Sequence, residues 1–289
     1  MEEKPFRKHF QQEKEEKKAK KSGWLFLFIT VLVCCVLFGI SYSFNQNYYY
    51  IEVEGKSMQP TINPNPVIVE TTVGGVTQTS SVQDGVYVVP TKDIDYEDII
   101  ILENMFEEKK TIIKRALAFE GDYITIAKVE NEEGMMVFRL MRVKSGHSEV
   151  EVLPEKYIKS EWEWATYYSP AEAQMPQDSQ TTNIVYEIDF YETFSFGDYQ
   201  ERIFNVDGRD VKFFKVPEGE LFYLGDNRTQ SRDSTEEGTA SVEHLLGKTV
   251  RIVRNGTYYS GNFFFFFNRL GEALSIIWDE ILRFFGATI

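Results

Sequence analysis

The chain has 289 residues, a length compatible with one large domain or two modest ones. Its formal net charge of −14 argues against a nucleic-acid-binding protein, because such proteins present a basic surface to phosphates. Its two cysteines, Cys34 and Cys35, are adjacent within an apolar run, so they suit neither a disulfide framework nor a metal site. The HExxH metal motif and the P-loop and GxGxxG nucleotide motifs are also missing from the sequence, and we expect no cofactor.

The most hydrophobic part of the chain is residues 23–44, a run of 22 residues without a charge. A helix rises about 1.5 Å per residue, so this run is long enough to span a hydrocarbon core of roughly 30 Å. A cleaved signal peptide is the alternative, but its apolar region usually has only about 7–15 residues. Tyr48, Tyr49 and Tyr50 follow the run and suit the aromatic belt of a membrane interface. The pattern predicts an uncleaved transmembrane anchor.

The charges beside this run predict its orientation in the cell membrane. Four lysines lie at positions 17, 18, 20 and 21, directly before the run, whereas no basic residue follows it until Lys56. The positive-inside rule therefore places the N-terminus in the cytoplasm and the residues after the anchor outside the cell. The tail before the anchor is poor in apolar residues and rich in Lys, Glu and Gln, which predicts disorder.

The part between Tyr48 and Arg254 has the texture of strands and turns. Short runs rich in Val, Ile, Tyr and Phe are bounded by turn signals such as Asp84-Gly85 and Glu120-Gly121. This pattern predicts a mainly antiparallel β domain. Two polar stretches are expected to be loops. The expected strands lie at 86–90, 98–102, 111–119, 122–129, 136–143, 211–214, 220–226 and 248–253, and the loops at 71–85 and 160–183.

Residues 263–285 carry too many charges for a second membrane span. Projected at about 100° per residue, their apolar side chains fall on one side and their charges on the other, with Ile276 as the exception, so the pattern predicts an amphipathic helix. Two locations remain open for it: the membrane interface, or a position packed on the domain or on a partner. The expected apolar face comprises Phe267, Leu270, Leu274, Ile277, Trp278, Ile281, Phe284 and Phe285.

These patterns divide the chain into four parts. We expect a cytoplasmic tail (1–22), a transmembrane anchor (23–44), a mainly β part (45–255) and a C-terminal amphipathic helix (256–289).

One serine after the anchor, Ser57 in the stretch VEGKSMQPTI, raises the question of how it would be activated. The three histidines (9, 147 and 244) carry no strong local signature of a Ser–His pair. A lysine serves instead only if burial lowers the pKa of its amine from about 10.4. Lys114 fits, because in a strand it shares a face with Ile112 and Ala116, while the adjacent Arg115 points the other way. A surface lysine on an edge strand is the alternative.

A third stretch, LGDNRTQSRDST (224–235), follows an apolar strand. It is either an ordinary polar turn or the source of a group that orients a lysine base, for which a hydroxyl is suitable.

Together these stretches resemble the sequence boxes of the bacterial type I signal peptidases, membrane-anchored serine proteases of the Ser–Lys class. GKSMQPTI is similar to their nucleophile box, and IKRALAFEGD to their lysine box. The stretch from Val216 is similar to a box ending in Gly-Asp-Asn-x-x-x-Ser-x-Asp-Ser. The boxes occur in the family's order, together with similar stretches at 95–102 and 244–253. The resemblance implies that residues 45–122 and 211–255 form the catalytic β domain and that residues 123–210 are the variable insertion of the family.

The resemblance implies a role for each matching residue. Ser57 would be the nucleophile, Lys114 the general base, and Ser231 the hydroxyl that orients the lysine amine. The main-chain N–H of Ser57 would donate to the oxyanion, while Gly55 stands where some members have a serine that adds a second donor. The remaining matching residues would support the site: Gly55, Met58, Pro60, Arg115, Gly225, Asp226, Asn227, Asp233 and Ser234.

The sequence departs from the family pattern at three positions. Ala118 and Glu120 replace the usual Gly and Pro of the lysine box, which puts local rigidity in doubt. Thr235 replaces an arginine that commonly pairs with the position of Asp233, which puts a salt bridge in doubt.

The implied function is hydrolysis of one peptide bond in exported pre-proteins, which releases them from their signal peptides. The expected partners are those signal peptides, the lipid bilayer and the export translocon. Three alternatives remain: a signal peptidase dedicated to pilin or surface-fibre precursors, a self-cleaving repressor, which would need a DNA-binding domain in place of the anchor, and a catalytically silent membrane-anchored assembly protein.

Overall fold

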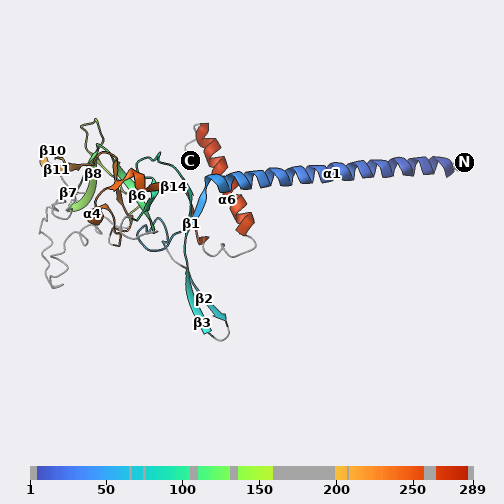
Figure 1. Cartoon of the computed structure of the whole chain (residues 1–289), viewed down its shortest axis with the longest axis horizontal. Helices are drawn as coiled ribbons and strands as arrows, with labels where there is room; N and C mark the ends of the chain where they lie inside the picture. The colour runs from blue at the N-terminus through green and yellow to red at the C-terminus, as the bar shows by residue number, and fades with distance from the viewer. Residues whose placement is uncertain are drawn as a thin grey trace. The chain divides into compact units, whose positions relative to one another are not determined.

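The computed structural model describes residues 5–64, 67–73, 76–104, 110–130, 136–158, 199–206, 208–228, 230–256 and 265–285. The chain forms two compact units. One comprises Met1–Tyr48 and Phe266–Ile289, and the other comprises Tyr49–Phe265. Figure 1 labels their helices and strands.

The first unit consists of two helices, α1 (Pro5–Asn47) and α6 (Phe265–Phe284). The stretch Lys20–Asn47 of α1 is long and apolar enough to cross a membrane, with a mean hydropathy of 2.7 over its most apolar window and none of that window buried. The hydroxyl of Tyr48, directly after α1, donates a hydrogen bond to Glu280 of α6. The residues predicted as the anchor are helical in α1, and α6 confirms the predicted C-terminal helix.

The expectation that residues 1–22 are disordered is wrong for the described part, because α1 begins at Pro5 and continues without a break into the apolar stretch. Lys, Glu and Gln are good helix formers, and Glu13 and Glu16 each precede a lysine by four residues. Proline is also well tolerated in the first turn of a helix. The low apolar content of the tail shows that it cannot form a hydrophobic core, but it does not exclude a helix.

The second unit is mainly antiparallel β structure, as the sequence predicts. Its largest sheet has seven strands in the order β1-β4-β14-β5-β6-β12-β13, and each pair is antiparallel. These strands are β1 (Tyr49–Glu52), β4 (Gly85–Val89), β5 (Ile99–Glu103), β6 (Thr111–Phe119), β12 (Glu220–Leu224), β13 (Ala240–Ser241) and β14 (Leu245–Val253). A short helix, α4 (Ser234–Glu237), and a 3-10 turn, η2 (Val242–His244), follow β12 and β13.

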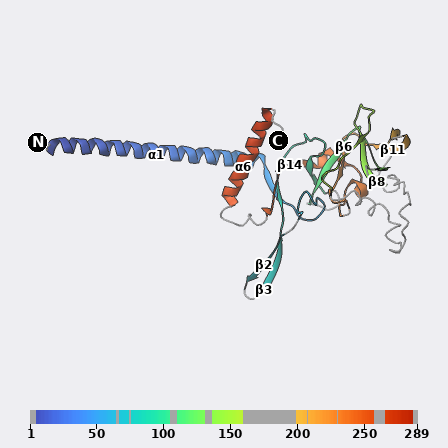
Figure 2. The same ribbon diagram turned by 180° about the vertical axis from the view of Figure 1, so that it is seen from behind.

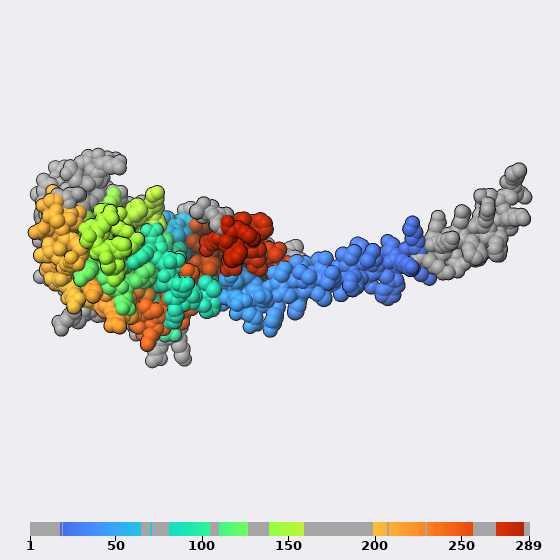
Figure 3. Space-filling view, turned by 90° about the horizontal axis from the view of Figure 1, so that it is seen from above, coloured from blue at the N-terminus to red at the C-terminus, as the bar shows by residue number. Residues whose placement is uncertain are grey.

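A second sheet of five antiparallel strands shares a hydrophobic core with the first. Its order is β10-β11-β7-β8-β9, and Figure 3 shows β10 and β11, in yellow to orange, beside β8 in yellow-green. Leu117 of β6 and Phe222 of β12 pack in one buried cluster with Ile124, Leu140 and Phe214 of this second sheet. The strands are β7 (Tyr123–Glu130), β8 (Met136–Val143), β9 (Glu151–Val152), β10 (Glu201–Val206) and β11 (Arg209–Lys215).

The proposed boundary between insertion and catalytic domain at residue 210 falls inside β11. β11 pairs with β7 through Phe214 and Ile124, so it belongs to the sheet of the insertion. Because the two sheets bury one another's apolar faces, the insertion is a layer of the domain and contributes to its core. The expected loop at 160–183 lies outside the described residues.

The other expected loop, residues 71–85, is wrong in most of its length. Strands β2 (Val67–Val73) and β3 (Val76–Val82) form a two-stranded antiparallel hairpin, which projects away from the larger sheets in both Figures 1 and 2. Thr and Val, the commonest residues of these strands, have high β propensity, and Gly74-Gly75 lies between the strands where hairpins favour glycine. The polarity of the stretch concealed its strand propensity.

Leu117 tests the shared core, because its side chain is fully buried between the two sheets. Leu117→Ala is expected to lower the free energy of unfolding by about 2–5 kcal/mol, since it removes buried methyl groups and leaves a cavity. Ile203→Ala on β10, where the side chain is 63% exposed, is the matched control and should change it by less than about 0.5 kcal/mol. Guanidinium unfolding of both variants in detergent, followed by near-UV circular dichroism, measures the difference; equal midpoints would contradict a shared core.

Candidate active site

Ser57 lies in a turn between β1 and the hairpin, and its side chain is half-buried. The next residue, Met58, and Ile62 are 2% and 1% exposed and pack in a core cluster with Ile113 of β6. The main-chain N–H of Ile62 donates to the carbonyl of Met58 at 2.8 Å, which closes the turn. Pro60 follows a cis peptide bond and is exposed. The apolar side chains that flank Ser57 thus fix its backbone against the sheet.

Lys114 lies in the interior of the seven-stranded sheet. Its strand, β6, is flanked by β5 and β12, and Lys114 is the register partner of Ile100. The Lys114 residue is only 4% exposed. The alternative of a surface lysine on an edge strand is therefore wrong.

Burial holds the pKa of the Lys114 amine below its ordinary value, because the charged form loses its hydration in this environment. The carboxylates of Asp233, Glu237 and Asp226 act in the opposite direction and offset part of this effect. A lysine with a lowered pKa has a larger neutral fraction near pH 7 than an exposed lysine and is thus better able to accept a proton.

Gly225, directly after β12, is the point where the serine segments meet. A β-carbon built on Gly225 would lie 2.1 Å from the Oγ of Ser231 and 2.5 Å from the carbonyl oxygen of Ser57. The main-chain N–H of Asn227 also donates to that carbonyl, at 2.9 Å, and the Asn227 side chain donates to the carbonyl of Lys56 at 3.0 Å. Only glycine fits this close approach, and it brings Ser57 and Ser231 together.

A buried ion pair joins the lysine strand to the same loop. Arg115 donates through Nε and Nη2 to the two carboxylate oxygens of Asp226, at 2.8 and 2.6 Å, and both side chains are buried. Thr61, in the serine turn, donates its hydroxyl to the same carboxylate. Arg115 thus connects the strand of Lys114 both to the loop after β12 and to the serine turn.

Asp233 and Ser234 support the loop after β12. Asp233 accepts from the main-chain N–H of Gly225 at 2.9 Å, and from both the N–H and the hydroxyl of Thr235 at 3.1 and 2.7 Å. The Ser234 hydroxyl accepts from the N–H of Tyr223 at 2.9 Å. Thr235, which stands where the family commonly has an arginine, therefore binds the Asp233 carboxylate through neutral donors, and no salt bridge forms between these two positions.

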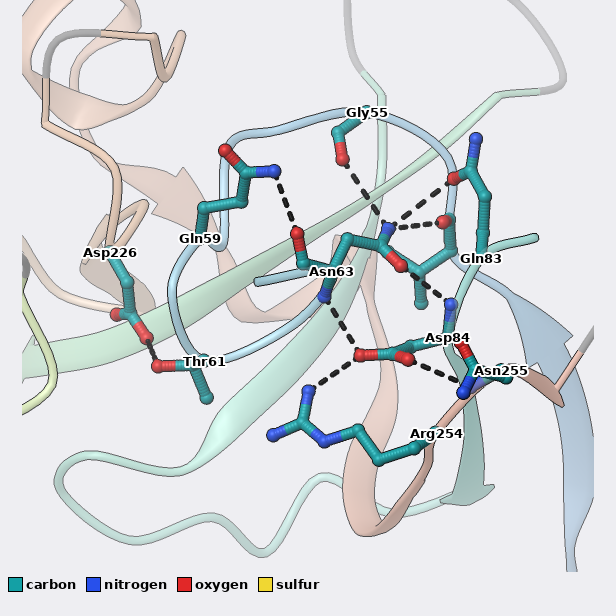
Figure 4. Close-up of polar contacts among 10 residues, drawn as sticks. Gly55, Gln59, Thr61, Asn63, Gln83, Asp84, Asp226, Arg254 and Asn255 are labelled. Atoms are coloured by element: carbon teal, nitrogen blue, oxygen red, sulfur yellow. Dashed lines mark hydrogen bonds and ion pairs between the residues drawn. The ribbon is translucent and has the colours of Figure 1, made fainter. Parts of the chain in front are cut away.

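A second set of polar contacts, which the sequence analysis missed, closes the turn that carries Ser57 (Figure 4). Asn63 and Asp84 exchange two hydrogen bonds: the N–H of Asn63 donates to Asp84 Oδ2 at 2.8 Å, and the N–H of Asp84 donates to Asn63 Oδ1 at 2.5 Å. The Asn63 amide also donates to the carbonyl of Val53 at 2.8 Å. Arg254 and the N–H of Asn255, at the end of β14, donate to Asp84. The only feature of the sequence that could have indicated these contacts is that Asn63 and Asp84 are residue types that favour turns.

A third set, also missed, joins the loop after β9 to the site. Arg228 and Glu155 form an ion pair at 2.6 Å with both side chains 1% exposed. Arg228 also donates to the carbonyl of Gly225 at 2.8 Å, directly beside the Ser57 and Ser231 contacts. In the same loop, the ring of Tyr157 lies 4.0 Å from the guanidinium carbon of Arg115. The insertion therefore contributes side chains that hold both arginines of the site.

The remaining candidates lie elsewhere. His244 contacts Glu103 at 3.3 Å on an exposed part of the surface, and His147 is exposed in a turn. Within the described ranges, no group of three or more His, Cys, Asp or Glu side chains is placed to hold a metal ion.

The Glu155–Arg228 pair generates a prediction for the insertion. Glu155→Gln is expected to lower the free energy of unfolding by about 3–5 kcal/mol, because it leaves the Arg228 charge buried without its partner. Glu201→Gln on β10 is the control: the side chains of Glu201 and its ion-pair partner Lys212 are 45% and 46% exposed, so loss of this pair should cost about 1 kcal/mol or less. Denaturant unfolding of the two variants compares them, and an equal loss of stability would show that burial of the pair is unimportant.

Comparison with known proteins identifies the family of the chain. The family described as "Signal peptidase, peptidase S26" matches residues 23–253, which is well over half of the chain. Among solved structures, the crystal structure of a signal peptidase I from Enterococcus faecalis V583 is similar at 16% sequence identity and a TM-score of 0.26, and the match covers 54% of this chain and 96% of that chain. The match to the family, over the segment that carries Ser57, Lys114 and Ser231, shows that the chain belongs to the peptidase S26 signal peptidases.

Proposed function

We propose that this signal peptidase cleaves exported pre-proteins with Ser57 as the nucleophile and Lys114 as the general base. The observation that carries the proposal is the buried amine of Lys114, whose pKa is lowered, on a strand tied by Arg115 and Asp226 to the loop that meets Ser57. A charged lysine at this depth would be costly without a partner, whereas a neutral amine accepts a proton.

The mechanism is acyl transfer in two steps. Lys114 takes the proton of the Ser57 hydroxyl as Oγ attacks the scissile carbonyl, and it returns a proton to the amine that leaves. It then takes a proton from water, which attacks the acyl carbonyl, and returns that proton to Ser57 Oγ as the bond between Oγ and the acyl carbon breaks and the new carboxyl group leaves. The hydroxyl of Ser231, which is 3% exposed beside Gly225, orients the lysine amine without fixing its charge as a carboxylate would.

Charge that develops on the scissile carbonyl oxygen is stabilised by the main-chain N–H of Ser57. A serine hydroxyl in place of Gly55 would supply a second donor, but the backbone of Gly55 has a φ of +94°, which disfavours any L-residue. A β-carbon there would meet nothing within 4 Å, so backbone conformation, and not crowding, favours glycine. We infer that this enzyme works without a side-chain donor at position 55.

The substrate binds as an added strand beside the site. β1 pairs only with β4 among the described strands, so its other edge is available. On β6, pairing with β12 begins at Arg115 and Leu224, which leaves residues 111–113 without a β12 partner. An extended signal peptide that pairs with these two edges would present its main-chain carbonyl to Ser57.

The apolar helix α1 anchors the enzyme in the cell membrane, with its N-terminus in the cytoplasm and residues 49–265 outside. The lysines before the apolar stretch support this orientation through the positive-inside rule. An anchored enzyme meets its substrates where the translocon delivers them, still held in the bilayer by their signal peptides.

Ser57→Ala and Lys114→Ala should each reduce pre-protein cleavage by at least about 10³-fold, because one removes the attacking oxygen and the other the base. Lys56→Ala is the matched control: Lys56 is adjacent to Ser57 but exposed, so this variant should cleave normally. Cleavage of a purified pre-protein in detergent, followed by gel electrophoresis, measures all three. Normal cleavage by either of the first two variants would refute the proposed dyad.

The pH dependence of Lys114 gives a separate prediction. Its pKa is lowered in the folded chain, so the unfolded chain binds the proton more readily and stability rises with pH up to about 10.4. Lys114→Met removes this group while filling similar space, so it should stabilise the protein at neutral pH, by a margin that shrinks as the pH rises toward 10.

Thermal unfolding of both forms between pH 6 and 10 measures this margin. In the same range, cleavage by the unmodified enzyme should increase as Lys114 loses its proton. A margin that does not change with pH would show that the Lys114 amine is not desolvated.

A further inference from the structure

Five residues of the apolar face predicted for the C-terminal helix are exposed in the structure. Leu274, Trp278, Ile281 and Phe284 of α6, and Phe285 after it, are 42%, 59%, 41%, 85% and 78% exposed. Projected at about 100° per residue, they form one continuous stripe. Figure 3 draws the described atoms of α6 in red. Five large apolar side chains exposed together, unlike scattered ones, mark a surface that binds something apolar.

A different flank of α6 is used within the protein. Ala273 and Ile276 are 1% and 3% exposed, and Glu280, on the same flank, accepts a hydrogen bond from Tyr48. Ile276, the exception to the predicted amphipathic pattern, is therefore a packing residue. Because Tyr48 directly follows the apolar stretch Lys20–Asn47, this flank fixes α6 at the end of that stretch.

We propose that α6 lies in the outer interface of the bilayer, with Leu274, Trp278, Ile281, Phe284 and Phe285 inserted among the lipids. The inference rests on the proposed membrane anchor: if α1 spans the bilayer, Tyr48 lies near its surface, and α6 is held at that depth. The hydrogen bond to Tyr48 holds α6 beside the end of the apolar stretch of α1. An aromatic-rich face of this kind is suited to the boundary between headgroups and acyl chains.

The charges of α6 indicate how it binds. Its five charged residues are two arginines and three acids, so the helix has a net charge of −1. Attraction to anionic headgroups therefore contributes nothing, unlike in the basic amphipathic helices that adsorb electrostatically. Burial of apolar surface is the driving force, and binding should depend on neither lipid charge nor salt concentration.

Two positions on α6 provide a sharp test. Ile281 belongs to the apolar stripe and Arg283 lies nearly opposite to it, yet both side chains are exposed in the structure. We would make Ile281→Cys and Arg283→Cys separately in a full-length chain that carries Cys34→Ala and Cys35→Ala. Each variant would be reconstituted at low density in phosphatidylcholine vesicles and treated with a membrane-impermeant maleimide.

The Ile281→Cys variant should react at least about tenfold more slowly than Arg283→Cys, because lipid covers only the apolar stripe. The ratio should be the same in vesicles with anionic lipid and in high salt. Equal rates, or slow reaction at both positions, would overturn the proposal. So would protection of Ile281→Cys that increases with protein density, which would indicate a second copy of the chain as the occupant.

A separate measurement distinguishes failure of the anchor from failure of the proposal. Retention of the protein in the membrane pellet after alkaline carbonate extraction tests α1 alone, since an interfacial helix does not resist this treatment. Retention combined with equal labelling rates would refute the interfacial position of α6 and leave the anchor intact. Loss from the pellet would remove the premise and overturn both.

Discussion

The site depends on the buried ion pair between Arg115 and Asp226. The guanidinium group belongs to the strand that carries Lys114, and the carboxylate belongs to the loop that contacts Ser57. Thr61 adds the serine turn to the same carboxylate. Taking both charges out of water is costly, and only their bidentate geometry and the additional donor offset that cost. Such a pair contributes less to net stability than to selecting one arrangement of the three segments, and one arrangement is what the proposed serine and lysine dyad requires.

The pattern of residues was sufficient to predict those parts of the molecule that are determined locally. The alternation of β6 placed Lys114 and Arg115 on opposite faces, and the strand is central as a buried lysine requires. The apolar runs predicted most strands of both sheets, and the 3.6-residue period predicted α6. That Gly225 brings Ser57 and Ser231 together could be anticipated only through the family resemblance, because no local pattern encodes contact between residues so distant in the chain.

The parts that could not be predicted depend on partners distant in the sequence, or combine a polar composition with residues that favour strands. Nothing around Glu155 indicates that its carboxylate is buried against Arg228, since each residue taken alone is typical of a surface. The hairpin of β2 and β3 is polar, so its β-branched residues were the weaker signal. The boundary of the insertion was misplaced because β11 pairs with β7 across more than eighty residues, and pairing, not composition, determines which sheet a strand joins.

The order in which the chain emerges from the ribosome gives the position of Gly225 a further consequence. A nascent chain that has been synthesised only past Lys114 already contains the serine and the lysine, but it lacks the loop that holds them in register. Arg228 in that loop pairs with Glu155, and Asp84 accepts a hydrogen bond from Asn255, directly after β14. The site therefore forms only when nearly all of residues 49–255 have been made, and a protease built in this way remains latent during its own synthesis.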